Sequence, residues 1–211
     1  MDPKVLKKTS FCDKYIDNVT DDEMKKYILD NLKLKSHLTY NSKYSILYNT
    51  KFINNLNNPH LISLRTTGAS YFLFCTQING VNYSFLIDKK KKDGYLYPTI
   101  FVVNYRFSSE LFNGTLFETE LLKISDNNWI LILCDIYIHK GNHFKTHTII
   151  DRIKIINNIL LNEYLDDDFC NICPLQIKKF YDFNQLNHII KNDIHNFPYK
   201  IKGIYFIPLK P

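Results

Sequence analysis

Two cysteines near the C-terminal end of the chain have the spacing of a metal-ligand pair. Cys170 and Cys173 are separated by two residues, and His188 and His195 follow them. A tetrahedral zinc site takes a second pair of ligands at finger spacing, and none follows here. A redox pair is less favoured still, because no thioredoxin-like βαβ pattern surrounds the cysteines. We therefore expect neither a metal nor a cofactor, with a zinc site as the minor alternative.

The other groups that could act in catalysis form no familiar constellation. His37, His60, His143 and His147 show no triad spacing. The chain has 6 glycines, which leaves little room for a glycine-rich phosphate loop. Four consecutive lysines at 89–92 precede an Asp-Gly pair. This run is typical of a solvated hairpin turn, and a contact with a phosphate backbone is the alternative.

Composition favours an anionic partner. The 211 residues carry a formal net charge of +6, and 15% of them are aromatic. A basic balance suits RNA or a phosphate-bearing nucleotide. Most of the rings should fill β-sheet cores, although aromatic side chains also stack on bases. Lysine is abundant together with asparagine and isoleucine, which indicates an AT-rich genome such as that of a parasite, a bacterium or a large DNA virus.

The sequence gives no sign of a membrane or of secretion. No apolar run follows the basic start, and no stretch approaches the length that spans a bilayer. Five cysteines are an odd number, which does not fit a disulfide framework. We expect a cytoplasmic protein with reduced thiols.

The expected elements begin with a polar, lysine-rich N-terminal arm at residues 1–20. Thr20-Asp21-Asp22-Glu23 has the form of a capping box, so a helix should run from there to about Leu34. A cluster of asparagines at 54–59 breaks the chain. Asn79-Gly80 is the strongest hairpin signal. Strands are expected at 61–65, 70–77, 82–88, 99–105, 114–123 and 129–137.

The last third of the chain predicts a second helix between strands. One apolar stripe, which includes Ile149, Ile153, Ile156 and Leu160, predicts a helix over 148–164. Strands at 175–180 and 201–207 enclose a short helix at 183–191. Helices at the edges of an antiparallel β core indicate an α+β fold, with one domain over residues 21–211.

The order of these elements, with several motifs, resembles the nucleotidyltransferase domain shared by mRNA guanylyltransferases and polynucleotide ligases. The first motif of that family reads Lys-x-Asp-Gly-x-Arg, and here the matching run is Arg65-Thr66-Thr67-Gly68-Ala69-Ser70. The Asp-Gly-Glu of the third motif falls on Glu118-Thr119-Glu120. The next strand, 129–135, ends in an acid as the family's does, and Asp151-Arg152 resembles the polar helix start that follows it.

Later motifs depart further from the family. The run from Cys170 to Tyr181 resembles the strand before the fourth motif. The fourth motif falls on residues 202–206, where Lys202 replaces an acid. The sequence ends at Pro211 with no counterpart of the fifth motif or of the oligonucleotide-binding (OB) domain. The resemblance implies a guanylyltransferase-like antiparallel core with flanking helices and no OB domain.

The resemblance also implies that catalysis has been lost. The family's nucleophile is a lysine that attacks as a neutral amine, and Arg65 occupies its place. A guanidinium stays protonated at any working pH, so it cannot take this role. The acid and the arginine of the first motif are missing as well.

A second resemblance is to the cap-binding domain of snurportin, which looks like a guanylyltransferase that kept its pocket and lost catalysis. Its pattern of Asp, aromatic, basic, Gly and Phe is similar to residues 135–144, with His139 in the slot of the aromatic residue that stacks on the methylated base. Tyr137, Phe144, Trp129 and Tyr205 are alternative stacking partners.

These resemblances imply a cap pocket. A methylated guanine is cationic and favours aromatic faces, and an acid that accepts from its N1 and N2 donors adds specificity. Glu118 or Glu120 would be that acceptor, unless both lie on an exposed strand face. Trp129 is as readily a sheet core residue, and His139 a loop histidine. The phosphate contacts would come from Arg65, Lys140, Arg152 or Lys202, with Thr66 and Thr67 beside them.

We therefore expect a non-catalytic domain that binds the 5′ cap of RNA, in the translation or handling of viral mRNA. Its partners would be capped mRNA or a cap nucleotide, with a protein of a translation or capping complex as a further partner. One alternative is a divergent guanylyltransferase fragment whose lysine lies elsewhere, for example Lys51 or Lys89. Another is a scaffolding subunit of a capping or initiation complex.

Overall fold

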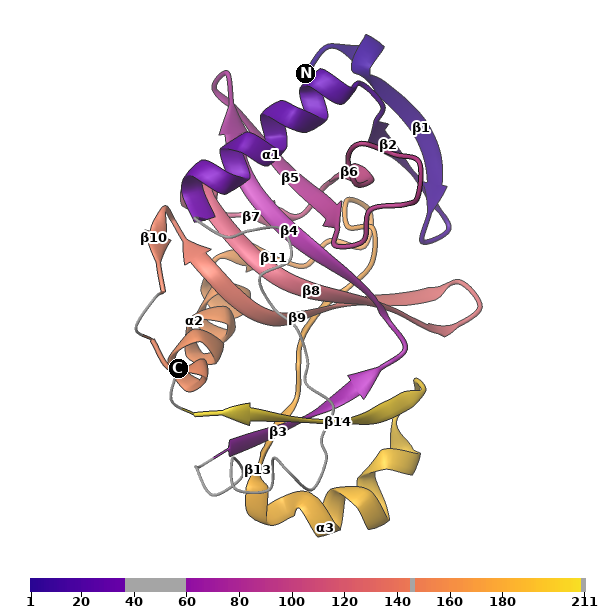
Figure 1. Ribbon diagram of the computed structural model, residues 1–211, viewed down its shortest axis with the longest axis vertical. Coiled ribbons are helices and arrows are strands. Elements are labelled where there is room, and N and C mark those ends of the chain that lie inside the picture. Colours follow the sequence, from indigo (N-terminus) through magenta and orange to yellow (C-terminus); the bar gives the residue numbers. More distant parts are fainter. Residues whose placement is uncertain (37–59, 145–146, 210–211) are drawn as a thin grey trace.

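A nine-stranded, mostly antiparallel sheet forms the centre of the protein. The computed structural model describes residues 1–36, 60–144 and 147–209. The strand order is β1-β2-β6-β5-β4-β8-β9-β10, and β12 adds to β9 in parallel (Figure 1). The strands of this sheet are β1 Leu6–Phe11, β2 Lys14–Val19, β4 Ala69–Ile78, β5 Val81–Asp88, β6 Ile100–Val103, β8 Asn113–Ser125, β9 Asn128–His139, β10 Asn142–His143 and β12 Leu175–Ile177.

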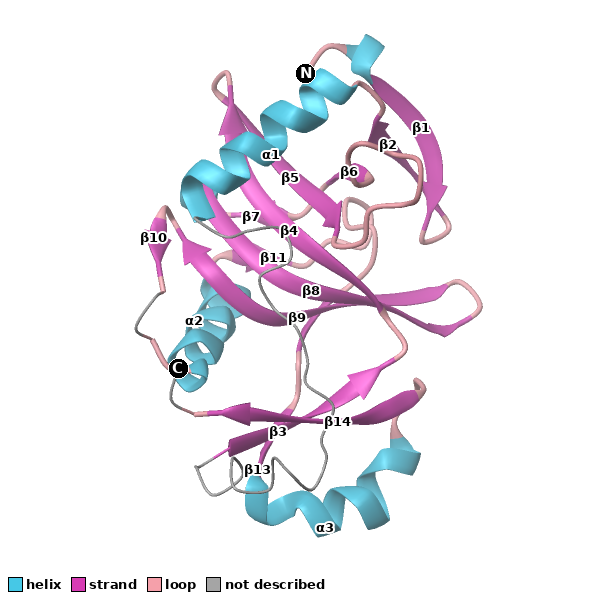
Figure 2. Ribbon diagram, in the orientation of Figure 1, coloured by secondary structure: helices cyan, strands magenta, loops and turns pink. Residues whose placement is uncertain are grey.

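A second sheet of three strands lies beside the main one. Its order is β13-β3-β14, with β13 Phe180–Asp182, β3 His60–Thr66 and β14 Ile201–Pro208. The chain passes from β3 directly into β4, so these two strands link the sheets (Figure 2). Leu186, Ile189 and Ile194 pack against Ile62 and Leu64 of β3. They come from a run of short helical turns, η4 Phe183–Gln185, α3 Leu186–His188, η5 Ile189–Asp193 and η6 Ile194–Asn196.

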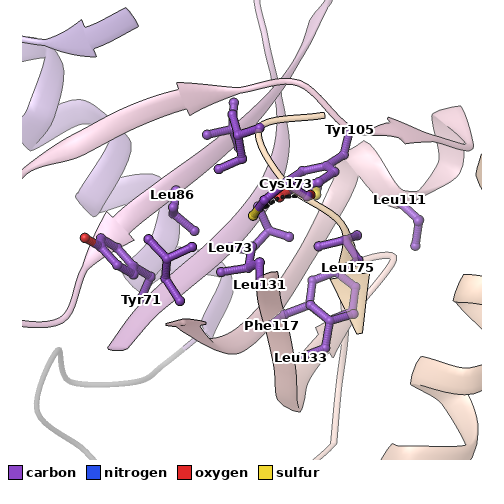
Figure 3. Close-up of a cluster of buried hydrophobic side chains, with 14 of the residues drawn as sticks. Tyr71, Leu73, Leu86, Tyr105, Leu111, Phe117, Leu131, Leu133, Cys173 and Leu175 are labelled. Atoms are coloured by element: carbon purple, nitrogen blue, oxygen red, sulfur yellow. Dashed lines mark hydrogen bonds between the residues drawn. The ribbon is translucent and has the colours of Figure 1, made fainter. Parts of the chain in front are cut away.

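The two long helices cover opposite faces of the main sheet. α1 (Asp22–Ser36) packs Ile28 and Leu32 with Phe74 of β4. α2 (Ile149–Asn162) packs Ile156 and Ile159 with the side chains that point the other way. Figure 3 shows part of this second cluster, in which Leu73, Phe117, Leu131 and Leu133 meet. The two clusters follow from the two-residue period of strands, because successive side chains face opposite sides.

The prediction that residues 1–20 form an N-terminal arm without regular structure is wrong. Residues 6–19 form the hairpin of β1 and β2, and β2 pairs with β6 at the edge of the main sheet. Ile16 and Val19 are buried, while the lysines of β1 are exposed. Because Lys7 and Lys8 are adjacent, β1 lacks the regular alternation of apolar and polar residues that predicts a strand. The turn contains no glycine, although Cys12 and Asp13 have φ of 51° and 60°. Such angles normally favour glycine or asparagine, so the usual hairpin signal was missing.

Most of the other expected elements are confirmed. Asn79 and Gly80 have φ of 50° and 77°, the signs that a type I′ hairpin turn requires. The helices expected at 20–34 and 148–164 are present, but the capping box expected of Thr20 is wrong: Asp21 Oδ1 accepts from the Met24 N–H at 2.7 Å, while the Thr20 hydroxyl donates to the Val5 carbonyl. A capping box that was not expected is formed by Thr148 and Asp151 at the start of α2. The single strand expected at 175–180 is split into β12 and β13, which belong to different sheets. The breaker at 54–59 lies outside the described residues.

The architecture is mixed, with a mostly antiparallel sheet and few helices, and is compatible with the α+β class. The described residues also include a two-stranded ladder of β7 (Arg106–Phe107) and β11 (Tyr164–Leu165), and the 3-10 turns η1 (Pro3–Val5) and η3 (Ser109–Phe112). Among the described residues, no helix has the length and apolar character to cross a bilayer.

Candidate functional site

Two carboxylates point from the same face of β8. Glu118 and Glu120 alternate with Phe117, Thr119 and Leu121 along the strand, and Phe117 and Leu121 face the α2 side. Residues two apart on a strand lie about 7 Å from each other. The two acids are therefore neighbours on the opposite face, and each has its own cationic partner.

Glu120 belongs to a group where the two sheets meet, which we call the junction cluster: Arg65, Thr66, Glu120, Lys178 and Tyr205. The Thr66 hydroxyl donates to Glu120 Oε1, and Lys178 Nζ lies 3.1 Å from Oε2. Both side chains of the ion pair are only 11% exposed. Lys178 Nζ lies 5.6 Å from the centroid of the Tyr205 ring, and Arg65 Cζ lies 5.9 Å from it.

The Lys178 ammonium is stabilised in this position. Burial acts to lower the pKa of Lys178, the charge and hydrogen bond of the Glu120 carboxylate act to raise it, and the net direction is upward. Burial raises the pKa of the nearby Cys134 thiol to about 12, so this cysteine stays neutral. Lys178 is therefore a fixed cation and not a free amine.

Gly68 closes the turn between β3 and β4 next to this group. Its backbone N–H donates to Thr66 Oγ1 over 3.1 Å. A Cβ at this position would lie 2.5 Å from Glu120 Cγ and 2.8 Å from the carbonyl oxygen of Leu121. Real Cβ atoms do not approach so closely, so glycine is required here because of its neighbours and not because of its φ.

A small crevice borders the junction cluster between the sheets. Its walls are Leu64, Thr66, Ile132, Lys178, Lys179, Phe197 and Tyr199. The rings of Phe197 and Tyr199 lie 5.4 Å apart with a tilt of 42°. Lys179 Nζ lies 5.9 Å from the Phe197 centroid. The crevice has a volume of about 10 Å³, the room of a single water molecule, so a base enters only if its walls move apart. Those walls combine aromatic faces with cations beside a buried carboxylate.

Glu118 forms a second group, the central cluster, with Lys89 and Tyr137. Lys89 Nζ lies 2.6 Å from Glu118 Oε1, and the Tyr137 hydroxyl donates to Oε2. Burial, with the Glu118 charge, raises the pKa of Tyr137 far above its ordinary value. Tyr137 is thus a hydrogen-bond donor to the acid, and its ring lies edge-on to Phe72 at 6.2 Å.

The guanidinium of Arg152 is paired with an acid and is therefore not available to contact a ligand. Its Nε and Nη2 donate to the two oxygens of the buried Asp135, at 2.7 and 3.2 Å. Its Nη1 donates to the carbonyl of His147 at 2.6 Å. This bidentate pair fixes α2 to β9, so Arg152 is a structural cation in this arrangement.

A third group, which we call the distal cluster, lies at the far end of β9 and consists of His139, Lys140, Phe144, Glu110 and Glu163. The rings of His139 and Phe144 are stacked at 6.3 Å, and Lys140 Nζ lies 2.6 Å from Glu110 and 2.9 Å from Glu163. Ile132 pairs with Glu120 and precedes His139 by seven residues. At about 3.3 Å per residue, the two clusters are roughly 20 Å apart. One base cannot contact both.

The distal cluster should make stability depend on pH. Burial lowers the pKa of His139 from its ordinary 6.5. The Glu163 carboxylate, 3.9 Å from Nε2, acts in the opposite direction but does not reverse the shift. The unfolded chain then binds the proton more readily, so the free energy of unfolding should fall as the pH drops below about 6.5.

In urea titrations at pH 7.5 and 5.5, His139→Asn should lose less stability between the two pH values than the wild type. His188→Asn, at a side chain that is 64% exposed, should behave as the wild type; equal losses in all three proteins would refute the assignment.

The remaining expected site residues stand apart from these clusters. Trp129 packs against the core on the α2 side, and its Nε1 donates to Asp13 over 2.7 Å. Thr67 and Lys202 are exposed at the ends of β3 and β14. Of the expected residues, the structure thus brings together Arg65, Thr66, Glu120 and Tyr205, and it separates them from Trp129, His139, Lys140 and Phe144.

The cysteine pair does not combine with the histidines that follow it. The Tyr105 hydroxyl donates to the Cys173 carbonyl at 3.2 Å, and Cys173 is buried in the main core (Figure 3). His188 instead faces Asn192 and Asp193. Within the described ranges, no three His, Cys, Asp or Glu side chains gather in a way that could hold a metal ion.

The sequence patterns do not identify several residues of the site. Lys178 and Lys179 fit a strand without a functional motif, and Phe197 and Tyr199 belong to no motif. A signal existed at residues 175–178, where Gln176 and Lys178 alternate with Leu175 and Ile177 and so share one face of a strand.

No family model matches the chain, and a search of curated proteins finds no relative.

Proposed function

We propose that this protein binds the methylated guanine cap of RNA at the junction cluster without catalysing nucleotidyl transfer. The observation that carries the proposal is a buried carboxylate, Glu120, that lies between two sheets beside aromatic rings and cations. We further propose that the domain is a degenerate guanylyltransferase-like domain, as the sequence resemblance implies.

Glu120 is the acceptor for the guanine edge. Its two oxygens receive one donor each, from Thr66 and Lys178. A carboxylate offers about four lone-pair sites, so it can accept further N–H donors. In a dry site such charge-assisted bonds are about twice as strong as neutral ones, which favours guanine over bases that lack the N1–H and N2–H pair.

Aromatic rings and cations supply the other two requirements. Tyr199 lines the crevice, and Glu120 and Lys178 both influence its pKa, which burial raises. We assign the stacking role to this ring in place of His139, which lies at the distal cluster. Arg65 is exposed, with its Cζ 5.9 Å from the centroid of the Tyr205 ring of the junction cluster, and its guanidinium can hold phosphate in bidentate fashion.

The absence of catalysis is supported by the state of the lysines near the site. A nucleophilic lysine must attack as a neutral amine. Lys178 and Lys89 each form an ion pair with a carboxylate, at 3.1 and 2.6 Å. Lys51, the other candidate nucleophile, lies outside the described residues.

Calorimetric titration tests this function. The wild type should bind a methylated guanosine triphosphate more tightly than GTP, because the cationic base stacks more favourably on Tyr199. Tyr199→Ala should weaken binding of the methylated nucleotide about tenfold, in the range of a single stacked base. Equal affinity for the two nucleotides, or no binding of either, would refute cap recognition.

Arg65→Ala should weaken the same complex about tenfold, as the loss of one charged phosphate contact of about 1.5 kcal/mol. Arg106→Ala is the matched control, because Arg106 is also exposed but lies on β7 and pairs with Asp167. Incubation with labelled GTP and a divalent metal should leave no covalent adduct. A stable GMP–protein bond would replace this proposal with the divergent guanylyltransferase.

A further inference from the structure

The connection between β5 and β6 has two differently placed parts. Its first lysine, Lys89, points into the central cluster, while residues 90–96 are all exposed. The four-lysine run is therefore not one solvated turn. The side chain of Lys89 is anchored by Glu118, and those of the next three lysines are exposed.

Lys89 fixes this connection beside the start of β4. Its Nζ lies 2.6 Å from Glu118 and 4.9 Å from the centroid of the Phe72 ring. Its backbone N–H donates to the carbonyl of Ser70 over 3.1 Å. β4 follows directly on the turn that contains Gly68, so the lysine loop leaves the sheet on the same side as the junction cluster.

The next three lysines lie in a connection whose backbone is hydrogen-bonded. Lys90 N–H donates to Asp88 Oδ1 at 2.8 Å, and Tyr95 N–H donates to the Lys92 carbonyl at 3.2 Å. Among the described side chains, no carboxylate lies within ion-pair range of Lys90, Lys91 or Lys92. Three adjacent cations repel one another, and an anionic chain laid along them relieves that repulsion.

An exposed aromatic ring stands beside these cations. Tyr95 is 62% exposed and Leu96 is 68% exposed. Proteins that bind single-stranded RNA combine cations that follow the backbone with rings on which bases stack. The loop presents both within a few residues, next to the site proposed for the cap.

We propose that the loop at residues 90–96 binds the single-stranded RNA that follows the cap. Lys90, Lys91 and Lys92 contact its phosphates, and Tyr95 stacks on one of its bases. The inference rests on the proposed function for the position of the 5′ end, while the contact with RNA itself does not require a cap.

The test compares three ligands on the full chain by fluorescence anisotropy: a capped oligonucleotide of about ten nucleotides, the same oligonucleotide without its cap, and a cap dinucleotide as competitor. The triple variant K90A/K91A/K92A should bind both oligonucleotides about tenfold more weakly and the cap dinucleotide as tightly as the wild type. Its plot of log K against log salt should be shallower by about 2, because each contact with a single strand contributes about 0.7.

Two further variants separate the loop from general charge. K26A/K154A/K191A removes three exposed lysines from helical surfaces and should leave oligonucleotide binding almost unchanged. Tyr95→Phe keeps the ring and should bind as the wild type, whereas Tyr95→Ala should lose about tenfold. An equal loss in both triple variants, or no loss in K90A/K91A/K92A, would overturn the inference. A wild type that binds capped and uncapped oligonucleotides equally, and still depends on the loop lysines, would support this inference while it refutes the cap proposal.

Discussion

Replacing Glu120 by alanine is expected to lower the free energy of unfolding by about 3–5 kcal/mol, the cost of breaking a buried ion pair from one side. The reason is the state of its partner. Lys178 would stay in a site where its side chain is 11% exposed, without the carboxylate that lies 3.1 Å away. The Thr66 hydroxyl would lose its acceptor as well. Chemical denaturation with urea measures this change as a shift of the midpoint at constant slope.

Two comparisons isolate the buried charge as the cause. The double variant E120A/K178M should recover most of the lost stability, because it removes the unpaired ammonium and leaves an apolar side chain of similar length. Asp126→Ala breaks the ion pair with Lys123, in which the two side chains are 98% and 47% exposed, and should barely move the midpoint. If E120A costs no more than D126A, Glu120 is not held in the dry environment on which cap recognition depends.

Replacing Gly68 by alanine is the second change with a large expected effect. The added Cβ would lie within 2.8 Å of Leu121 O and Leu122 Cδ2 and within 2.5 Å of Glu120 Cγ. Backbone cannot yield as a flexible side chain does, so we expect a loss of about 1–3 kcal/mol from overpacking. Because the clash includes Glu120 itself, the variant should also lose affinity for the methylated nucleotide.

Gly203→Ala is the matched control for this variant. Gly203 lies on β14, opposite Arg65, and a Cβ there meets no atom within 4 Å. Its stability should stay close to that of the wild type. If Gly68→Ala is as stable as Gly203→Ala and binds nucleotide normally, then β8 does not lie as close to this turn as the structure shows.

Much of the fold could be predicted, because the main strands have local signals. The alternation of β4 and β5 and the Asn79-Gly80 turn between them predict a hairpin with little reference to the rest of the chain. The hairpin of β1 and β2 could not be predicted in this way. Its turn places Cys12 and Asp13 at positive φ, and the contacts that stabilise it come from far along the chain, such as that of Asp13 with Trp129.

The candidate site was predicted only in part. Glu118 and Glu120 could be placed on one face from the strand period, but their partners could not. Lys178 comes within reach because β12 joins β9 in parallel, a pairing between segments more than forty residues apart. Similarly, the spacing of residues 135–144 suggested one pocket around His139. His139 is the last residue of β9, seven residues beyond the Ile132 that pairs with Glu120, so it lies at the other end of the strand.

The most direct test of cap binding at the junction cluster is a crystal structure of the protein with a methylated cap dinucleotide. The account predicts the guanine within hydrogen-bond distance of Glu120 and stacked on Tyr199, with the phosphates directed toward Arg65 and no bond between phosphorus and any lysine. A nucleotide found beside His139 and Phe144, or a GMP joined to a lysine Nζ, would contradict it.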